Sequence, residues 1–115
     1  MIAKASMKHR RGSAQKARLV ADMIRGKRVE EALSILRFSR KSAARDLAKL
    51  LNSAVANAES KAAETRDRIE TDEMIVETIQ INGGPTGRRY QPAARGRATR
   101  IRKRTSHVDL RIADA

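Results

Sequence analysis

Apolar residues recur at helical spacing in three stretches of the first sixty residues. The spacing predicts helices over about 14–25, 29–37 and 41–60. Ser13 can cap the first helix through its hydroxyl, and Gly26 tolerates the left-handed backbone that ends many helices. The longest helix carries one continuous apolar stripe that is rich in alanine. Because alanine lets a neighbouring element approach closely, we expect this helix to pack centrally.

The pattern changes to that of β-strands in the second half of the chain. Residues 73–82, EMIVETIQIN, are rich in β-branched side chains, which favours a strand. Near the end, apolar residues alternate with Asp and Arg over 108–112, which predicts a strand with one buried face. A weaker strand pattern covers residues 2–8, and the polar residues 61–72 predict a loop.

A segment of unusual composition, GGPTGRRYQPAARGRATRIRKR, lies between the two later strands at 83–104. It holds four of the six glycines, both prolines, eight basic residues and no acid. Two strands joined by a Gly/Pro-rich segment favour a β-hairpin. We expect its arms at about 79–89 and 94–104, each about ten residues or on the order of 33 Å long. Only the base of such a hairpin could contact the core, and its tip would project.

Basic residues are concentrated at the two ends of the chain. The net charge is +13, and residues 1–28 carry nine Lys/Arg against one acid. Residues 29–78 carry eight against ten, and residues 79–115 carry nine against two. This distribution is typical of a protein that binds nucleic acid. Seven of the eight cations in the segment 83–104 are arginine, whose planar guanidinium binds phosphate through two hydrogen bonds.

Residues for catalysis are scarce. The chain has no cysteine and no phosphate-binding loop, and its two histidines fit contact or structural roles. Glu70, Asp72 and Glu73 are more typical of a solvated strand entry than of a cation site. We therefore expect no catalytic residue, no metal and no cofactor. The N-terminus has no apolar region typical of a secretory signal, and no apolar run is long enough to span a bilayer. We therefore expect a protein of the bacterial cytoplasm, or of an organelle if a transit peptide has been removed, with no membrane partner.

The helices offer two alternatives to nucleic-acid binding by the basic ends of the chain. Residues 18–36 form two short helices around Gly26, as in a DNA-binding helix-turn-helix. The second of these helices would have to enter the major groove, yet Glu30 and Glu31 near its start would be repelled by phosphates. A membrane-active basic helix is disfavoured because the cations cluster outside the helices and tryptophan is absent.

Three segments resemble the family of bacterial large-subunit ribosomal protein twenty-two. They are SAQKARLVADMIRGKRVEEAL at 13–33, LLNSAVANAE at 50–59 and GPTGRRYQPAARGRATRIRKRTSHV at 84–108. The resemblance covers nearly the whole chain in order. It implies an α+β fold in which three helices pack on a small antiparallel sheet with a long protruding β-hairpin. Residues 1–115 would then form a single rRNA-binding domain, with 83–104 as the hairpin arm.

The resemblance also implies a role, which is binding and not catalysis. Members of the family bind 23S rRNA, organise its packing beside neighbouring large-subunit proteins, and line the nascent-peptide exit tunnel with the hairpin. The chain would work in the cytoplasmic ribosome and not as a homo-oligomer. Two positions depart from the family pattern at or near the tip: Gly87, where many members carry a bulkier residue, and Ala93, where arginine is common.

Charge distribution and resemblance together give the expected site residues. The expected RNA-binding residues are Lys8, Arg10, Arg11, Lys16, Arg18, Arg25, Lys27, Arg88, Arg89, Arg95, Arg97, Arg100, Arg102, Lys103 and Arg104. The expected tunnel-lining tip comprises Arg88, Arg89, Tyr90, Gln91, Pro92, Ala93 and Ala94.

Overall fold

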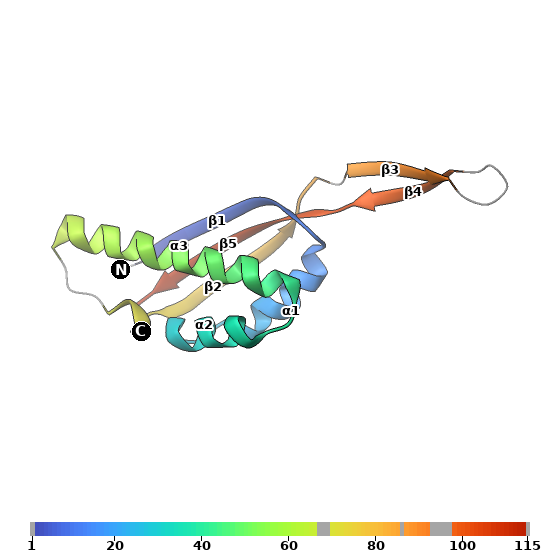
Figure 1. Ribbon diagram of the computed structural model, residues 1–115. Helices are drawn as coiled ribbons and strands as arrows, with labels where there is room; N and C mark the ends of the chain where they lie inside the picture. The colour runs from blue at the N-terminus through green and yellow to red at the C-terminus, as the bar shows by residue number, and fades with distance from the viewer. Residues whose placement is uncertain (1, 67–69, 86, 93–97, 115) are drawn as a thin grey trace.

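Three helices cover one face of a small antiparallel sheet, and a second pair of strands projects from its end (Figure 1). The structure is a computed structural model that describes residues 2–66, 70–85, 87–92 and 98–114, with Asp72 and the strands of the projecting pair described for the backbone alone. The elements are β1 (Ile2–Arg11), α1 (Ala14–Ile24), α2 (Val29–Phe38), α3 (Ser42–Thr65), the 3-10 turn η1 (Thr71–Glu73), β2 (Ile75–Gly83), β3 (Gly87–Pro92), β4 (Ala98–Lys103) and β5 (Thr105–Ala113).

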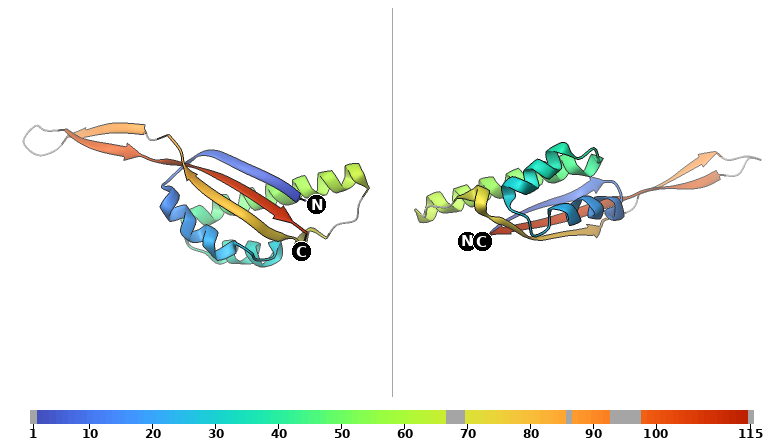
Figure 2. Two further views of the ribbon diagram at one scale, coloured as in Figure 1. Left: turned by 180° about the vertical axis from the view of Figure 1, so that it is seen from behind. Right: turned by 90° about the horizontal axis from the view of Figure 1, so that it is seen from below.

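The main sheet has the order β1-β5-β2, so that the last strand of the chain lies in the middle. Both neighbours pair with β5 in antiparallel register. The views of Figure 2 show all three helices on the same side of this sheet, which leaves its other face open. Strands β3 and β4 form a separate antiparallel pair. The expected α+β class, with three helices on an antiparallel sheet and a protruding hairpin, is confirmed.

The core lies between the sheet and the three helices. Val108, Leu110 and Ile112 alternate along β5 and are buried, as the sequence pattern predicts. Leu47 and Leu51 of α3 are fully buried and belong to the same apolar cluster. The alanines of α3 let the helix lie close to β1 and the other helices, which confirms its central position.

Helix ends follow the predicted chemistry in α1 and depart from it in α3. The Ser13 hydroxyl accepts the Lys16 backbone N–H at 3.3 Å, and Gly26 after the last turn has φ +78°. The prediction of a loop over 61–72 is wrong for residues 61–65, which continue α3. The apolar stripe extends through Ala58 to Ala62, and the alanine, lysine and glutamate of this turn favour helix.

The strand boundaries also differ from those predicted. Hairpin arms are expected from the sequence over 79–89 and 94–104. The predicted start of the first arm is wrong, because residues 79–83 belong to β2 and pair with β5 in the main sheet. Ile79 and Ile81 are buried, so this end of β2 is part of the core. The projecting strands are therefore six residues each. The tip, residues 93–97, lies outside the described part of the chain. The expectation that Gly87, Arg88 and Arg89 lie at or near the tip is wrong, because they begin β3 at the base of the hairpin and pair with Lys103, Arg102 and Ile101. The weak strand pattern of residues 2–8 becomes β1, which runs to Arg11 with an irregular register between Met7 and Arg10.

Side chains of α3 cover the outer edge of β1. Asn57 donates from its amide to the Lys4 carbonyl at 2.7 Å, and the Lys61 ammonium donates to the Ile2 carbonyl at 2.8 Å. Unpaired carbonyls on an edge strand invite pairing with another chain. These two hydrogen bonds fix α3 along β1 and occupy part of that edge.

Ser106 is a buried polar residue whose removal should stabilise the protein. Its side chain is 0% exposed, and its hydroxyl has no hydrogen-bond partner among the described residues. Because a buried hydroxyl without a partner is unfavourable, S106A should raise the free energy of unfolding by about 1 kcal/mol. Thermal melts followed by circular dichroism measure the change. A lower melting temperature would mean that the hydroxyl is hydrogen-bonded in solution.

Candidate nucleic-acid interface

The two basic ends of the chain meet at the base of the hairpin. The end of β1 pairs with the start of β5, and the Gly12 N–H donates to the Arg104 carbonyl at 3.0 Å. This contact places the N-terminal basic run, Lys8–Arg11, beside the end of the second arm of the hairpin at Arg104. Lys8, Arg11 and Arg104 are all exposed there. Two cations from the start of the chain therefore lie near Arg104, which is far from them in sequence.

A hollow of about 280 Å³ lies at the same place, between the start of α1 and the hairpin base. Arg18 of α1 and Arg104 both line it, together with Gly83, Gly84 and Thr105. Arg18 of the first helix therefore lies at the base of the hairpin, near Arg104. The remaining lining comes from Ser13, Ala14 and Gln15.

The hairpin base is held by a close backbone contact at Gly84. Its N–H donates to the Thr105 carbonyl at 2.9 Å, and the Thr105 hydroxyl donates to the Pro85 carbonyl at 2.6 Å. A Cβ at Gly84 would lie 2.6 Å from the Thr105 hydroxyl oxygen and 3.1 Å from a ring carbon of His107. Glycine is therefore required here by close approach, which aligns the arm with the body of the protein.

G84A should weaken the hairpin base, whereas G83A should not. The new methyl group at Gly84 would displace the Thr105 hydroxyl and break its hydrogen bond, at a cost of about 1–2 kcal/mol in unfolding free energy. Gly83 is the matched control because a Cβ there meets no atom within 4 Å. Urea denaturation of both variants tests this difference. Equal stability of the two variants would contradict the close contact at Gly84.

Arg10 differs from the other cations of the N-terminal run because its side chain is only 8% exposed. Its Nε donates to the Asp46 carboxylate at 2.7 Å, which ties β1 to α3. The structure therefore gives Arg10 a partner inside the protein. Lys8 and Arg11 are the members of this run whose side chains are exposed.

Arg18 and Arg25 both reach from α1 to the outer edge of β2. Arg18 donates to the Ile81 carbonyl from two nitrogens, at 3.0 and 2.8 Å. Arg25 donates to the Ile79 carbonyl at 2.9 Å and also pairs with Asp22. These guanidinium groups cover carbonyls of an edge strand while remaining at the surface. Both residues therefore have a structural contact in addition to any contact with RNA.

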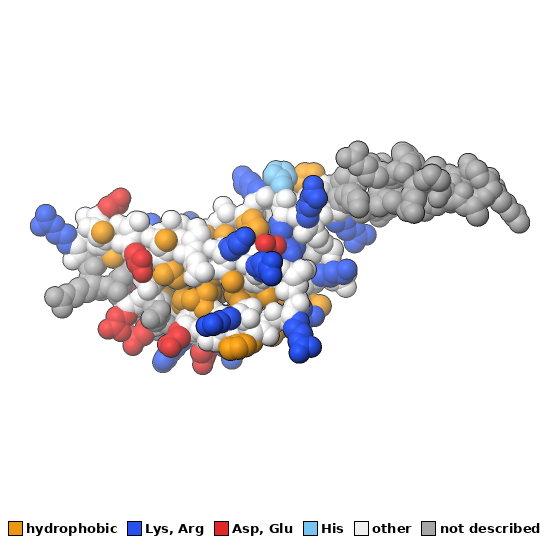
Figure 3. Space-filling model, in the orientation of Figure 1, with side chains coloured by type: hydrophobic (Ala, Val, Ile, Leu, Met, Phe, Trp, Pro, Cys, Tyr) orange, Lys and Arg blue, Asp and Glu red, His pale blue; other side chains and the backbone are white. Residues whose placement is uncertain are grey.

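Charge is separated along the molecule. In Figure 3 the acidic side chains gather mainly at the end away from the hairpin, and Lys and Arg are more frequent toward it. Lys16 and Lys27, at the two ends of the first helix and its turn, are exposed. Of the expected RNA-binding residues, Arg88, Arg89, Arg95, Arg97, Arg100, Arg102 and Lys103 have side chains outside the described part.

Comparison with known proteins decides the identity of this basic protein. The profile of the family described as "Ribosomal protein L22p/L17e" matches residues 5–113. The chain belongs to this family. It is 50% identical over 110 residues to "Large ribosomal subunit protein uL22" of Syntrophotalea carbinolica, an alignment that covers 96% of each protein. It is 48% identical over 114 residues to the protein of the same name from Geobacter sulfurreducens, covering 99% of this chain and 98% of the relative.

Membership of the L22p/L17e family confirms the resemblance seen in the sequence. The family consists of structural proteins of the ribosome, which in bacteria lies in the cytoplasm, so this chain is not an enzyme. The same finding decides against a helix-turn-helix DNA-binding protein. Within the described residues, no group of three or more His, Cys, Asp and Glu could hold a metal ion. No helix in the described ranges is long and apolar enough to cross a membrane.

In this L22p/L17e chain the histidines help to form the hairpin base. The His9 backbone N–H donates to Nδ1 of His107 at 3.1 Å, across 98 positions of sequence. The two rings meet edge to face, with centroids 5.0 Å apart. His9 has φ +58° at the irregular part of β1. The pair therefore stabilises the turn that brings the N-terminal cations to the arm.

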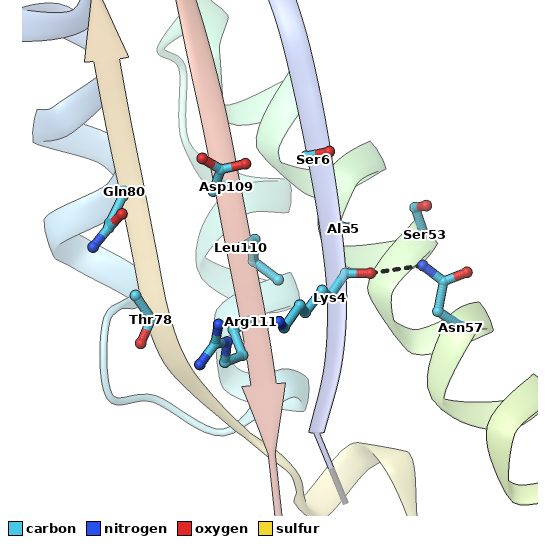
Figure 4. Close-up of a pocket in the computed structure, with 10 residues that line it drawn as sticks. All are labelled: Lys4, Ala5, Ser6, Ser53, Asn57, Thr78, Gln80, Asp109, Leu110 and Arg111. Atoms are coloured by element: carbon cyan, nitrogen blue, oxygen red, sulfur yellow. Dashed lines mark hydrogen bonds between the residues drawn. The ribbon is translucent and has the colours of Figure 1, made fainter.

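The open face of the sheet is polar but not predominantly basic (Figure 4). Asp109 on β5 lies between Ser6 and Gln80, and Arg111 lies between Lys4 and Thr78. A hollow along this face also reaches Ser53 and Asn57 of α3. Since Asp109 lies among the cations here, the open face of this family member is less uniformly basic than the hairpin base.

Proposed function

We propose that this chain binds 23S rRNA as a single domain, residues 1–115, with residues 83–104 as an arm inserted between RNA segments. The observation that carries the proposal is the meeting of exposed Lys8, Arg11 and Arg104 at the base of that arm. The arm itself carries seven cations and no acid over 87–103. Such a surface binds phosphates with release of counterions.

The role is architectural. The globular part presents Lys16 and Lys27 from α1 and its turn, while the arm extends away from the sheet (Figure 1). A protein of this shape contacts RNA segments that lie apart and fixes their packing. Recognition is by phosphate position and RNA shape and not by a base code. Its partners are the large-subunit rRNA and neighbouring proteins of that subunit, and it acts as one copy.

The expected RNA contacts divide into two kinds. Cations of the first kind contact phosphates directly. They are Lys8, Arg11, Lys16, Lys27, Arg104 and the cations of the arm. Arg18 and Arg25 face RNA while they cover the edge of β2, and Arg10 acts by holding β1 on α3. The first group should therefore affect RNA affinity more than protein stability.

Residues 88–94, which comprise most of β3 and the start of the tip, line the nascent-peptide exit tunnel in this proposal. Two findings support it: the similarity of residues 84–108 to the family and the projection of β3 and β4 from the body. A photo-crosslinking amino acid in place of Tyr90 should attach to a stalled nascent chain. The same group in place of Glu59, on an exposed face of α3, should not. Crosslinks from neither position or equally from both would contradict the tunnel role of residues 88–94.

Binding to protein-free 23S rRNA as a function of salt tests the rRNA role. Wild-type affinity should fall with salt, with a log–log slope of roughly −0.7 to −0.9 per phosphate contact. K8Q/R11Q/R104Q should make the slope shallower by about two to three. The control K4Q/R66Q/R111Q removes the same charge from exposed or half-exposed positions elsewhere and should change the slope little. Equal slopes for both triple variants would contradict the assignment, and equal affinity for duplex DNA would favour the DNA-binding alternative.

A further inference from the structure

A second basic surface lies on the globular part, in the groove between the end of α2 and the first half of α3. The groove has a volume of about 1090 Å³. Residues of α2, of the connecting turn and of α3 line it. Its cations are Arg37, Arg40, Lys41, Arg45 and Lys49. None of them is among the residues expected from the sequence to bind RNA, because they lie in the charge-balanced middle of the chain.

The cations of this groove are not neutralised within the protein. All five are exposed, and none forms an ion pair with an acid in the described ranges. Asp46 is the acid that lines the groove, and its carboxylate is already paired with Arg10. The acids of the middle segment lie elsewhere: Glu30 and Glu31 are in the first turn of α2.

The positions of two of these cations are unfavourable for the isolated helix. Lys41 is the N-cap residue of α3 and Arg45 lies in its first turns, where the helix dipole disfavours positive charge. No acid in the first turn compensates for them. A polyanionic partner would relieve this repulsion.

Phe38 is an exposed aromatic residue next to the cations of the groove in sequence. Its side chain is 81% exposed, the most exposed of the large apolar side chains described. Its sequence neighbours Arg37 and Ser39 both line the groove, although the ring itself is not part of the lining. An exposed aromatic ring beside arginines is the arrangement on which unpaired bases stack.

We propose that this groove binds an unpaired segment of rRNA, with one base stacked on Phe38 and its phosphates on Arg37, Arg40, Lys41, Arg45 and Lys49. The inference rests on the rRNA-binding function proposed above and adds a second contact surface to it. An acidic protein segment would satisfy the cations but carries an aromatic side chain only in some sequences, whereas every nucleotide carries a base that can stack on the ring. RNA supplies both phosphates and π-faces.

A single tryptophan tests the stacking contact. The chain contains no tryptophan, so F38W adds one emission signal at the groove. Protein-free 23S rRNA should quench that emission by about half or more, because a stacked base quenches indole. I2W is the control, since Ile2 is 43% exposed on β1, remote from α2. Quenching of F38W alone supports the proposal, and equal or absent quenching at both positions overturns it.

Charge removal tests the phosphate contacts independently. R40Q/K41Q/R45Q should lower rRNA affinity about tenfold and make the salt slope shallower by about two. K4Q/R66Q/R111Q has the same composition and the same loss of charge and serves as the matched control. If wild-type protein binds rRNA and the two triple variants behave alike, the groove is not an RNA site and an acidic protein partner is favoured. If wild-type protein does not bind rRNA, both this inference and the proposed function are overturned.

Discussion

Replacing residues 86–103 with Asn-Gly is expected to leave the globular part folded while affinity for 23S rRNA falls on the order of a hundredfold or more at about 0.1 M salt. The core is built from residues outside this segment, and β3 and β4 pair with each other in a sheet of their own. Gly84 and Thr105 already face each other across the base, so a two-residue turn can close the chain there. Helicity and melting temperature should therefore be nearly unchanged.

A second variant separates the effect of the arm's charge on rRNA affinity from the effect of removing the whole arm. Changing the six arginines and one lysine of residues 87–103 to glutamine keeps the length of the hairpin. The salt slope should become shallower by about five to six if each cation meets one phosphate. Circular dichroism and filter binding on both variants give the two readouts. A drop of more than about ten degrees in melting temperature after excision would show that the arm and the core unfold together.

D46A should be the most destabilising single change at the site, by about 2 kcal/mol in unfolding free energy. Its carboxylate is the partner of Arg10, whose side chain is 8% exposed, and removing it leaves a nearly buried guanidinium without an acceptor. Because Asp46 is itself 37% exposed, we place the cost below that of a fully buried pair.

The control for this prediction is D22A. Asp22 pairs with Arg25 at the surface, with both side chains about half exposed or more, so its loss should cost less than about 0.5 kcal/mol. R10M/D46L removes both charges and should recover much of the stability lost in D46A. Urea denaturation of the three variants measures these differences. Equal costs for D46A and D22A would show that Arg10 is well solvated in solution.

Local patterns predicted the helices and the central strand. Ser13 and Gly26 mark the start and the end of α1 through interactions that act within a few residues. The alternation of apolar and charged residues from Val108 to Ile112 predicts a strand with one buried face. The border between sheet and hairpin was not predictable in the same way. Ile79 and Ile81 suit either an arm or a core strand, and their pairing with β5 is set by contacts distant in sequence.

The site was predictable in kind but not in arrangement. The sequence places an excess of cations at both ends, but only the pairing of β1 with β5 brings Arg11 and Arg104 together. Arginine binds a phosphate, a carboxylate or a carbonyl with the same guanidinium. Sequence therefore cannot distinguish Arg10 and Arg18, which have hydrogen-bond partners within the protein, from an arginine that binds RNA alone. Counting charge along the chain likewise conceals the cation groove, because folding separates those cations from the acids near them in sequence.

Co-sedimentation tests the central claim that this chain is built into the large ribosomal subunit through RNA contacts. Tagged protein is followed through a sucrose gradient at low magnesium, which separates the subunits, and then through a moderate-salt wash. We predict a stoichiometric peak with the large subunit that survives the wash, and loss of that peak for the variant with a neutralised arm. Tagged protein at the top of the gradient, or protein that follows DNA until nuclease treatment, would contradict the account.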